Sequence, residues 1–346
     1  MFKNYILKLI CIDLLLLCGS FSAIAQEDMI SYYTHLAHGQ GKILLGAKPI
    51  EGILKRSELS ENERKKLNIA LHIRRFAFDS LLLYENKNYT RYYDQKGEPL
   101  LWAITGSKKY SLTPKTWKFP IVGEVGYKGF FTKEDAEYEA ALLQKEGYET
   151  RIREVNAWST LGFLNDPILS SMLNASIGDL ANVLIHELSH GTIFIKDDTD
   201  ESENLASFIG DQGAYLYLET YYGKDSKEYL QYKYDQEDYE LLAQNMLLGA
   251  QRLDSLYKAI EQENDMRKEA YKQKMIREIV EGLNRLPFHN PDAFKALRNP
   301  DKLPNNATFI LFRQYNNKSH IYRDEFEELA DSDLKKYIEI LKKRYG

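Results

Sequence analysis

The chain has 346 residues, a formal net charge of −5 and 44% apolar residues. This length suits one large domain or two ordinary ones, with enough apolar residues for a sizeable buried core. Lysine and arginine are scattered rather than clustered, which argues against a nucleic-acid partner.

Residues 1–25 have the pattern of a secretory signal peptide. Lys3 and Lys8 precede an apolar run over residues 9–17, and an A-x-A cleavage site stands before Gln26. The run is too short to span a membrane comfortably. We therefore expect an exported protein, periplasmic or associated with the cell envelope, without a membrane span.

Both cysteines, Cys11 and Cys18, lie in this leader. The mature chain is therefore expected to form no disulfide, and it has no cysteine to act as a nucleophile or a metal ligand. An alternative interpretation of the leader is a lipoprotein signal, in which Cys18 would carry the lipid.

The first part of the mature chain mixes helices and short strands. Residues 27–60 predict a helix around Tyr32, Leu36, Ile43 and Leu44 that is broken by Gly46 and Pro49. Ser60-Glu-Asn-Glu63 opens another helix with a capping box. Residues 89–131 alternate short apolar runs with Gly and Pro, which predicts three or four strands. Thr132 begins a further helix that should end at Gly147.

The next segment, Tyr148 to Val155, alternates like a strand. An exposed sheet edge can pair with the extended backbone of a peptide. The stretch from Arg151 to Ser159 is our candidate for such an edge, and an ordinary central strand is the alternative.

Beyond Leu216 the pattern is helical throughout. Residues 224–283 carry apolar residues at helical spacing among many charges, which predicts a long helical hairpin. Residues 306–315 and 331–341 are expected to form closing helices. We expect residues 26–222 to form the catalytic region and residues 223–346 a helical region packed on it.

One stretch carries metal chemistry. Residues 182–190 predict a mostly buried helix in which His186 and His190 lie four residues apart, on one face. Two imidazoles placed in this way can hold one metal ion, and Glu187 is close enough to reach a water bound to it. This is the H-E-x-x-H pattern of zinc hydrolases, in which the metal acidifies the water and the carboxylate takes its proton.

A catalytic zinc usually takes three protein ligands. A second helix is predicted to begin within ten residues of the first, capped by Thr199 or Asp200, and to run antiparallel to it. Glu203, in or just after its first turn, would then point back at the histidines. We expect Glu203 to be the third ligand, with Glu201 as the alternative.

These residues resemble the gluzincin pattern, and more closely a bacterial family of cell-envelope zinc aminopeptidases. The resemblance extends over most of residues 30–220, through the segments Tyr32-Tyr33, Gly39-Gln40, Ile73–Ala77, Ser111–Pro120, Tyr127–Phe131, Ala157–Phe163 and Asp166-Pro167, and near the end through Asn305–Ala307. It implies a zincin-like α+β fold, predominantly helical, with a small and mostly antiparallel sheet before the metal helix. It also implies zinc bound by His186, His190 and Glu203, with Glu187 as the general base.

The chain departs from these patterns at two places. Many members of the family have cysteines where this chain has Lys118 and Glu124. Many gluzincins have an aspartate four residues after the third ligand to orient a histidine, and here that position is Ser207. We expect Asp211 or a backbone carbonyl to orient the histidine instead.

Peptide hydrolysis also needs a group to stabilise the oxyanion and, in an aminopeptidase, an acid to bind the free amine. Tyr127 is our candidate for the oxyanion because it lies in one of the resembling segments; Tyr215 and Tyr315 are alternatives. The sequence does not choose among the acids Glu124, Asp198 and Glu201 for the amine.

The sequence therefore predicts an exported zinc metallopeptidase acting on peptides, most closely an aminopeptidase. An envelope endopeptidase is one alternative. A non-catalytic envelope protein with a structural metal is another, although a structural zinc site is usually closed by four protein ligands.

Overall fold

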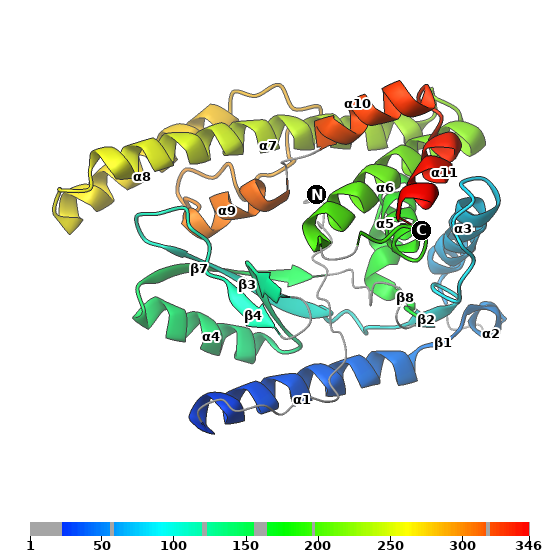
Figure 1. Cartoon of the computed structure of the whole chain (residues 1–346), viewed down its shortest axis with the longest axis horizontal. Helices are drawn as coiled ribbons and strands as arrows, with labels where there is room; N and C mark the ends of the chain where they lie inside the picture. Colours follow the sequence, from blue (N-terminus) through cyan, green and yellow to red (C-terminus); the bar gives the residue numbers. More distant parts are fainter. Residues whose placement is uncertain are drawn as a thin grey trace.

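The computed structural model describes residues 23–55, 59–119, 123–155, 165–195, 198–315 and 319–345. The fold is α+β and predominantly helical, with small, mostly antiparallel sheets, as the sequence predicts (Figure 1). Within the described ranges no helix is both long enough and apolar enough to cross a membrane. The predicted leader lies largely in residues 1–22, outside the described part.

The helices of the described chain follow one another from the N-terminal region to the C-terminus. Their bounds are α1 Ala23–Gly46, α2 Ile50–Leu54, α3 Glu61–Asp79, α4 Lys133–Lys145, α5 Ile177–His190, α6 Thr199–Tyr222, α7 Lys227–Ala259, α8 Asp265–Leu283, α9 Asn306–Tyr315, α10 Ser319–Ala330 and α11 Leu334–Tyr345, with a short 3-10 helix over Ser170–Asn174.

The strands form three small sheets. The first has the order β1-β2-β8, from Lys48–Pro49, Arg91–Tyr93 and Ile168–Leu169, and β2 and β8 are parallel. The second has the order β6-β3-β7 and is antiparallel, from Lys128–Phe130, Leu101–Lys108 and Tyr148–Val155. The third is the β4–β5 hairpin of Trp117–Phe119 and Gly123–Val125.

Residues 89–131 thus contain five strands in the described chain, one more than the upper estimate from the sequence. The extra strands are short, because the β4–β5 hairpin pairs only three residues on each side. Lys118 and Glu124, where the family resemblance suggests cysteines, are direct cross-strand partners in this hairpin. Opposite charges at such a position stabilise the pairing.

Helix starts follow the capping signals in the sequence. Ser60 accepts a hydrogen bond from the Glu63 amide at 3.2 Å, and the Glu63 carboxylate accepts one from the Ser60 amide at 2.8 Å, so the predicted capping box begins α3. Thr132 caps α4, and Gly147 follows it with φ of 79°, the left-handed conformation that glycine adopts freely.

The two faces of the β6-β3-β7 sheet have different partners. Ile104 and Ile152, opposite each other on β3 and β7, pack with Leu143 of α4 in one apolar cluster. Side chains alternate between faces along a strand, so Thr105 and Arg151, the next opposed pair, point the other way. That second face meets α9, where Arg151 donates a hydrogen bond to Thr308.

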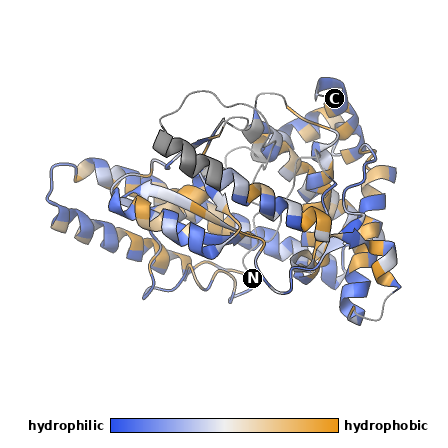
Figure 2. Cartoon of the chain, turned by 90° about the horizontal axis from the view of Figure 1, so that it is seen from below, coloured by the Kyte–Doolittle hydropathy of each residue, from blue (hydrophilic) through white to orange (hydrophobic). Residues whose placement is uncertain are grey.

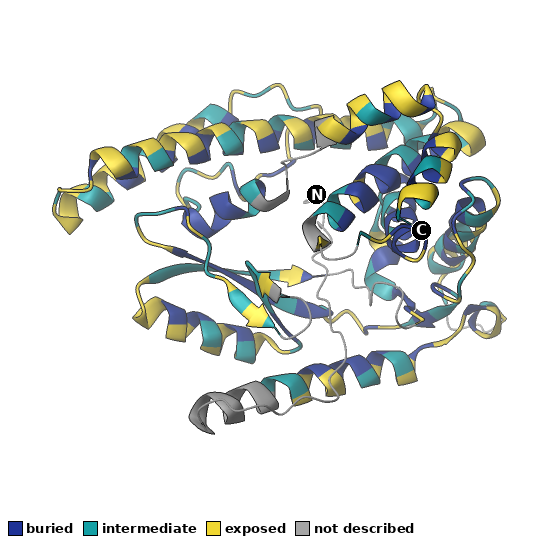
Figure 3. Cartoon of the chain, viewed as in Figure 1, coloured by how far each residue is buried: buried dark blue, intermediate teal, exposed yellow. Residues whose placement is uncertain are grey.

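The C-terminal helices pack on the sheet through apolar contacts and one buried polar cluster. In α7 and α8, Met246 and Ile276 are both fully buried in a shared apolar cluster, which confirms the predicted hairpin. Figure 2 shows apolar and polar positions alternating along these helices, and Figure 3 shows exposed residues along their outer sides. Lys272 of α8 is fully buried and is bound to the Glu149 carboxylate of β7.

The C-terminal end contains one helix that the sequence reading did not predict. α9 has the predicted bounds, and α11 begins three residues later than expected. The sequence pattern predicts no helix where α10 lies. Phe326 of α10 and Tyr337 of α11 pack against Phe208 of α6, so the C-terminus covers the outer side of the α5–α6 pair. The predicted division at residue 222 stays a prediction.

Candidate metal centre

The helix with the histidine pair is built into the core. Ser176 caps α5 by accepting a hydrogen bond from the Asp179 amide at 3.0 Å. His186, Glu187 and His190 are at most 4% exposed. Leu184, Ile185 and Leu188 of the same helix are fully buried, so α5 lies within the apolar core.

The second helix lies close against the first. Its cap is Asp198, which accepts a hydrogen bond from the Glu201 amide at 2.9 Å, and not Thr199 or Asp200 as the sequence reading expected. Since α6 begins at Thr199, the capping residue is the one before it. Eight residues separate α5 from α6, as predicted for antiparallel neighbours.

The close approach depends on Gly210. A Cβ atom built there would lie 2.8 Å from the Asn182 carbonyl oxygen and 2.8 Å from the Cβ atom of His186. Carbon atoms in ordinary contact stand about 3.5–4.0 Å apart. Any larger residue at this position would therefore push α6 away from the part of α5 that carries His186.

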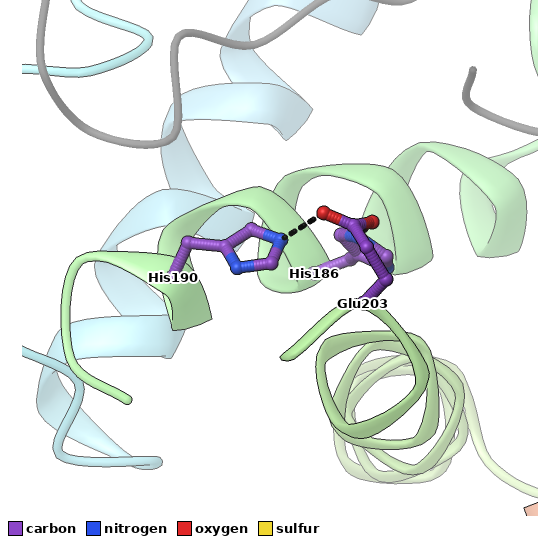
Figure 4. A group of neighbouring side chains, drawn as sticks. All are labelled: His186, His190 and Glu203. Atoms are coloured by element: carbon purple, nitrogen blue, oxygen red, sulfur yellow. Dashed lines mark ion pairs between the residues drawn. The ribbon is translucent and has the colours of Figure 1, made fainter. Parts of the chain in front are cut away.

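This packing brings Glu203 to both histidines. The Nε2 atom of His186 is 3.7 Å from one Glu203 carboxylate oxygen, and the Nε2 atom of His190 is 3.6 Å from the other. Figure 4 shows the His190 ring turned toward the Glu203 carboxylate, with their ion pair as a dashed line and His186 behind Glu203 in this view. The three ligand atoms lie within 4.8 Å of one another, and in the described chain this is the group able to hold a metal ion.

The donor set fits a divalent ion of zinc's size. Ligands about 2.1 Å from a tetrahedral ion stand roughly 3.3–3.4 Å apart, close to the 3.6 and 3.7 Å separations found here. Two neutral imidazoles and one carboxylate are typical of catalytic zinc sites, which keep a fourth position for water. Within the described residues no fourth His, Cys, Asp or Glu joins the group.

Two polar residues of α6 support the helix that carries the histidines. The Oγ atom of Ser207 is 3.4 Å from the Nδ1 atom of His186. The Oδ1 atom of Asp211 accepts hydrogen bonds from the side-chain amide of Asn182 and, at 2.8 Å, from the Tyr232 hydroxyl. On α6, Asp211 follows Ser207 by one helical turn. On α5, Asn182 precedes His186 by one turn, so the Asp211–Asn182 contact lies one turn from the Ser207–His186 contact. The expected role of Asp211 in orienting a histidine stays a prediction.

Tyr89 is a neighbour of the site that the sequence reading missed. It is 1% exposed, and burial, followed by the charges of Glu187 and Asp166, raises its pKa well above the usual value. The Tyr89 hydroxyl therefore stays protonated. Tyr89 has a φ of 60°, and its amide donates to the Asp166 carbonyl at 2.7 Å.

No sequence signal marks Tyr89, because this turn depends on tertiary contacts. Asn88 accepts from the Asp166 amide at 3.0 Å. Arg74 of α3 donates to the Asn88 carbonyl at 2.8 Å. These bonds hold a non-glycine residue in a left-handed conformation that it would otherwise avoid.

The tyrosines proposed for the oxyanion lie in different surroundings. Tyr127 is partly buried against the main apolar core. Tyr215 packs with Tyr229 and Tyr232, and burial, with Asp211 next, raises its pKa. The side chain of Tyr315 lies outside the described part.

The acids considered for the amine are also separated. Glu124 is exposed on β5. Asp198 is occupied in capping α6. Burial raises the pKa of the Tyr322 hydroxyl of α10, and its interaction with Glu201 raises this pKa further. Glu201, the alternative third ligand, is therefore not in the group with the histidines.

The candidate edge strand is partly described. β7 pairs with β3 along its whole length and with no other strand in the described residues, so Arg151–Val155 lies at a sheet edge. Residues 156–159 of the predicted edge fall outside the described ranges. Val155 belongs to the same apolar cluster as Leu184 and Leu188 of α5, so this strand ends at the core around the metal helix.

Comparison with known proteins gives one match. A family model described as "Putative aminopeptidase" matches residues 31–344, nearly the whole chain. No curated protein and no solved structure matches.

Proposed function

The chain belongs to this aminopeptidase family, and from that membership and the geometry of the site we propose that it is a zinc-dependent aminopeptidase. The observation that carries the proposal is the His186–His190–Glu203 group, whose three ligand atoms lie within 4.8 Å of one another. Zinc, when bound there, would supply a Lewis acid and lower the pKa of a coordinated water.

The chain's own residues would then manage the protons. Glu187 follows His186 on the same buried helix, about 100° around its axis, and would accept the proton of the attacking water. The same carboxylic acid would give this proton to the departing amine as the peptide C–N bond breaks. Water is consumed, and one carboxylate and one free amine are formed.

Burial, and after it the charge of Glu187, raise the pKa of Tyr89, so this hydroxyl would stay protonated while Glu187 accepts the proton of the water. Tyr127 remains our proposal for the group that stabilises the oxyanion, supported by its place in a segment shared with the family.

Export is also part of the proposal. Its support is the leader, with Lys3 and Lys8 before an apolar run and an A-x-A site before Gln26. Mass spectrometry of protein secreted from cells is expected to find Gln26 as the first residue. A lipid on Cys18 would instead indicate an anchored form.

The test compares wild type with Glu187→Gln, using Glu219→Gln as the matched control. Glu219 lies at the other end of α6, in an exposed ion pair with Lys224. We expect wild type and the control to release the first residue of free peptides and to leave N-acetylated peptides intact. Glu187→Gln should bind one zinc per chain and lose roughly 10²–10⁴-fold in kcat.

Each other result has a clear meaning. Full activity in Glu187→Gln would exclude Glu187 as the base. Cleavage of N-acetylated peptides would indicate an endopeptidase. Stoichiometric zinc binding without cleavage of any peptide, together with a fourth protein ligand in X-ray absorption, would indicate a structural metal.

A further inference from the structure

A guanidinium lies between the sheet and α9 without a carboxylate partner. Arg151 of β7 donates one hydrogen bond, from Nη1 to the Thr308 hydroxyl at 2.9 Å, and no ion pair joins it to any acid of the described chain. Burial, and then the charge of Arg153, lower its pKa to about 10. Arginine is rarely withdrawn from water unless it is paired.

The acid best placed on the same strand is already bound. Glu149 lies two residues before Arg151 and so points to the same face of the sheet. Its carboxylate binds Lys272 and accepts a hydrogen bond from the Asn306 amide at 3.0 Å. It is therefore committed to holding α8 and α9 on the sheet.

A second polar side chain, that of Thr105, lies on the same face of the sheet as Arg151. Thr105 is directly opposite Arg151 on β3, so the two side chains lie on one face. Thr105 is fully buried, and its hydroxyl has no hydrogen-bond partner in the described residues. A buried hydroxyl without a partner is costly, which points to a ligand that completes it.

The three groups form a donor set suited to one small anion. The guanidinium offers a planar fork of N–H groups, and each threonine hydroxyl can donate one further hydrogen bond. A carboxylate has two oxygens with about four acceptor sites in a plane, which this set can fill. The position of these three residues relative to the metal helix also suits the binding of a peptide substrate.

β7 leads from this cluster toward the metal helix. Figure 1 shows α9 over the β3–β7 sheet and β7 running toward α5 and α6. Arg151 is four residues from Val155, which belongs to the same large apolar cluster as Leu184 and Leu188 of α5. At about 3.3 Å per residue, the strand from Arg151 to Val155 spans about 13 Å.

We propose that Arg151, Thr105 and Thr308 bind the C-terminal carboxylate of short peptides. This inference rests on the proposed function, since it makes the protein selective for small free-acid peptides rather than for chain ends of large proteins.

Kinetics on the zinc-loaded protein provide the first test, with tetra-alanine and its C-terminal amide as substrates. In wild type we expect the KM of the acid to be about tenfold or more below that of the amide, as hydrogen bonds to a charged group imply. In Arg151→Gln the two KM values should become equal, with kcat within about twofold. The control is Arg252→Gln, which removes an equal charge from an exposed ion pair with Glu278 and should keep the wild-type ratio.

Thr105→Val gives a readout that a purely structural role would not produce. Valine has the shape of threonine without the hydroxyl that lacks a partner, so we expect a higher Tm for the free protein. The same variant should bind tetra-alanine more weakly. A lower Tm, or unchanged binding of the acid, would contradict the assignment of Thr105.

Binding measured without turnover separates this inference from the proposed function. Calorimetric titration of Glu187→Gln protein with tetra-alanine, its amide and inorganic phosphate should show binding of the acid that Arg151→Gln removes. That result supports the carboxylate site even if wild type hydrolyses nothing. Equal behaviour of acid and amide, including no binding of either, overturns the proposal, and so does phosphate that binds as tightly as the peptide acid.

Discussion

Replacing Gly210 with alanine tests whether helix packing sets the geometry of the metal centre. The new methyl group would lie 2.8 Å from the Asn182 carbonyl oxygen and 2.8 Å from the His186 Cβ atom. Neither atom can move by a simple side-chain rotation, because both are fixed by the path of α5. The helices must therefore separate by about 0.7 Å or more to restore ordinary contact.

This separation acts directly on the third ligand. Glu203 is 3.7 and 3.6 Å from the two histidine nitrogens, already slightly more than the roughly 3.3 Å expected around zinc. A further 0.7 Å would place the carboxylate beyond the reach of a shared ion unless the helices are drawn together again. We expect zinc affinity to fall by about 10–100-fold, the range found when the support of a metal ligand is lost.

Global stability should change much less. Overpacking costs about 1–3 kcal/mol, and the higher helix propensity of alanine offsets about 1 kcal/mol of it. The matched control is Gly249→Ala in α7, where the methyl group would lie 2.9 Å from the Ile279 Cγ2 atom, far along the chain from the site. Because the methyl group there meets side-chain atoms that can shift, the control should lose no more stability than Gly210→Ala and should keep the zinc affinity of wild type.

Zinc affinity is measured by competition with a chromophoric chelator, and stability by urea denaturation of the metal-free proteins. A folded Gly210→Ala protein that binds zinc within twofold of wild type would refute the reasoning. It would show that α6 can yield elsewhere and that Glu203 reaches the ion independently of this contact.

Two further predictions concern the surroundings of the site and the C-terminal helices. Ser207→Ala removes the 3.4 Å contact with His186 and should weaken zinc binding several-fold, up to about tenfold. The Tm of the metal-free protein should stay the same. Unchanged zinc affinity in the chelator competition would contradict this prediction. Lys272→Met leaves the partly buried Glu149 carboxylate without its cation and should cost about 1–3 kcal/mol in urea denaturation. Adding Glu149→Gln should restore part of the loss, and a single variant as stable as wild type would count against the contribution of this pair.

The metal ligands were predictable because their spacing is local. His186 and His190 are fixed on one helix face by the helical repeat alone. Glu203 required one further step, a short connection to an antiparallel helix, and the structure places it at both histidines. The same short-range reasoning predicted the capping box at Ser60 and the bounds of α9.

Features that depend on contacts between distant segments were not predictable in this way. The turn at Tyr89 is held by Asp166 and Arg74, which are distant in the sequence, so no local pattern announces it. Helix α10 did carry a signal, since Tyr322, Phe326 and Ala330 recur every four residues. Charged residues dominate between these three apolar positions and weaken the helical pattern.

Ser207 shows why motif knowledge alone misplaces the support of the site. A carboxylate four residues after the third ligand would bind a histidine strongly, whereas a hydroxyl at 3.4 Å is a weak partner. Close packing adds to the support of His186, because Gly210 allows α6 to press against the backbone of α5 beside that histidine. A site held by packing has a metal affinity that follows the separation of two helices. Its tolerance of larger residues at Gly210 should therefore be lower than its tolerance of changes at Ser207, an order that the two variants can establish in a single titration series.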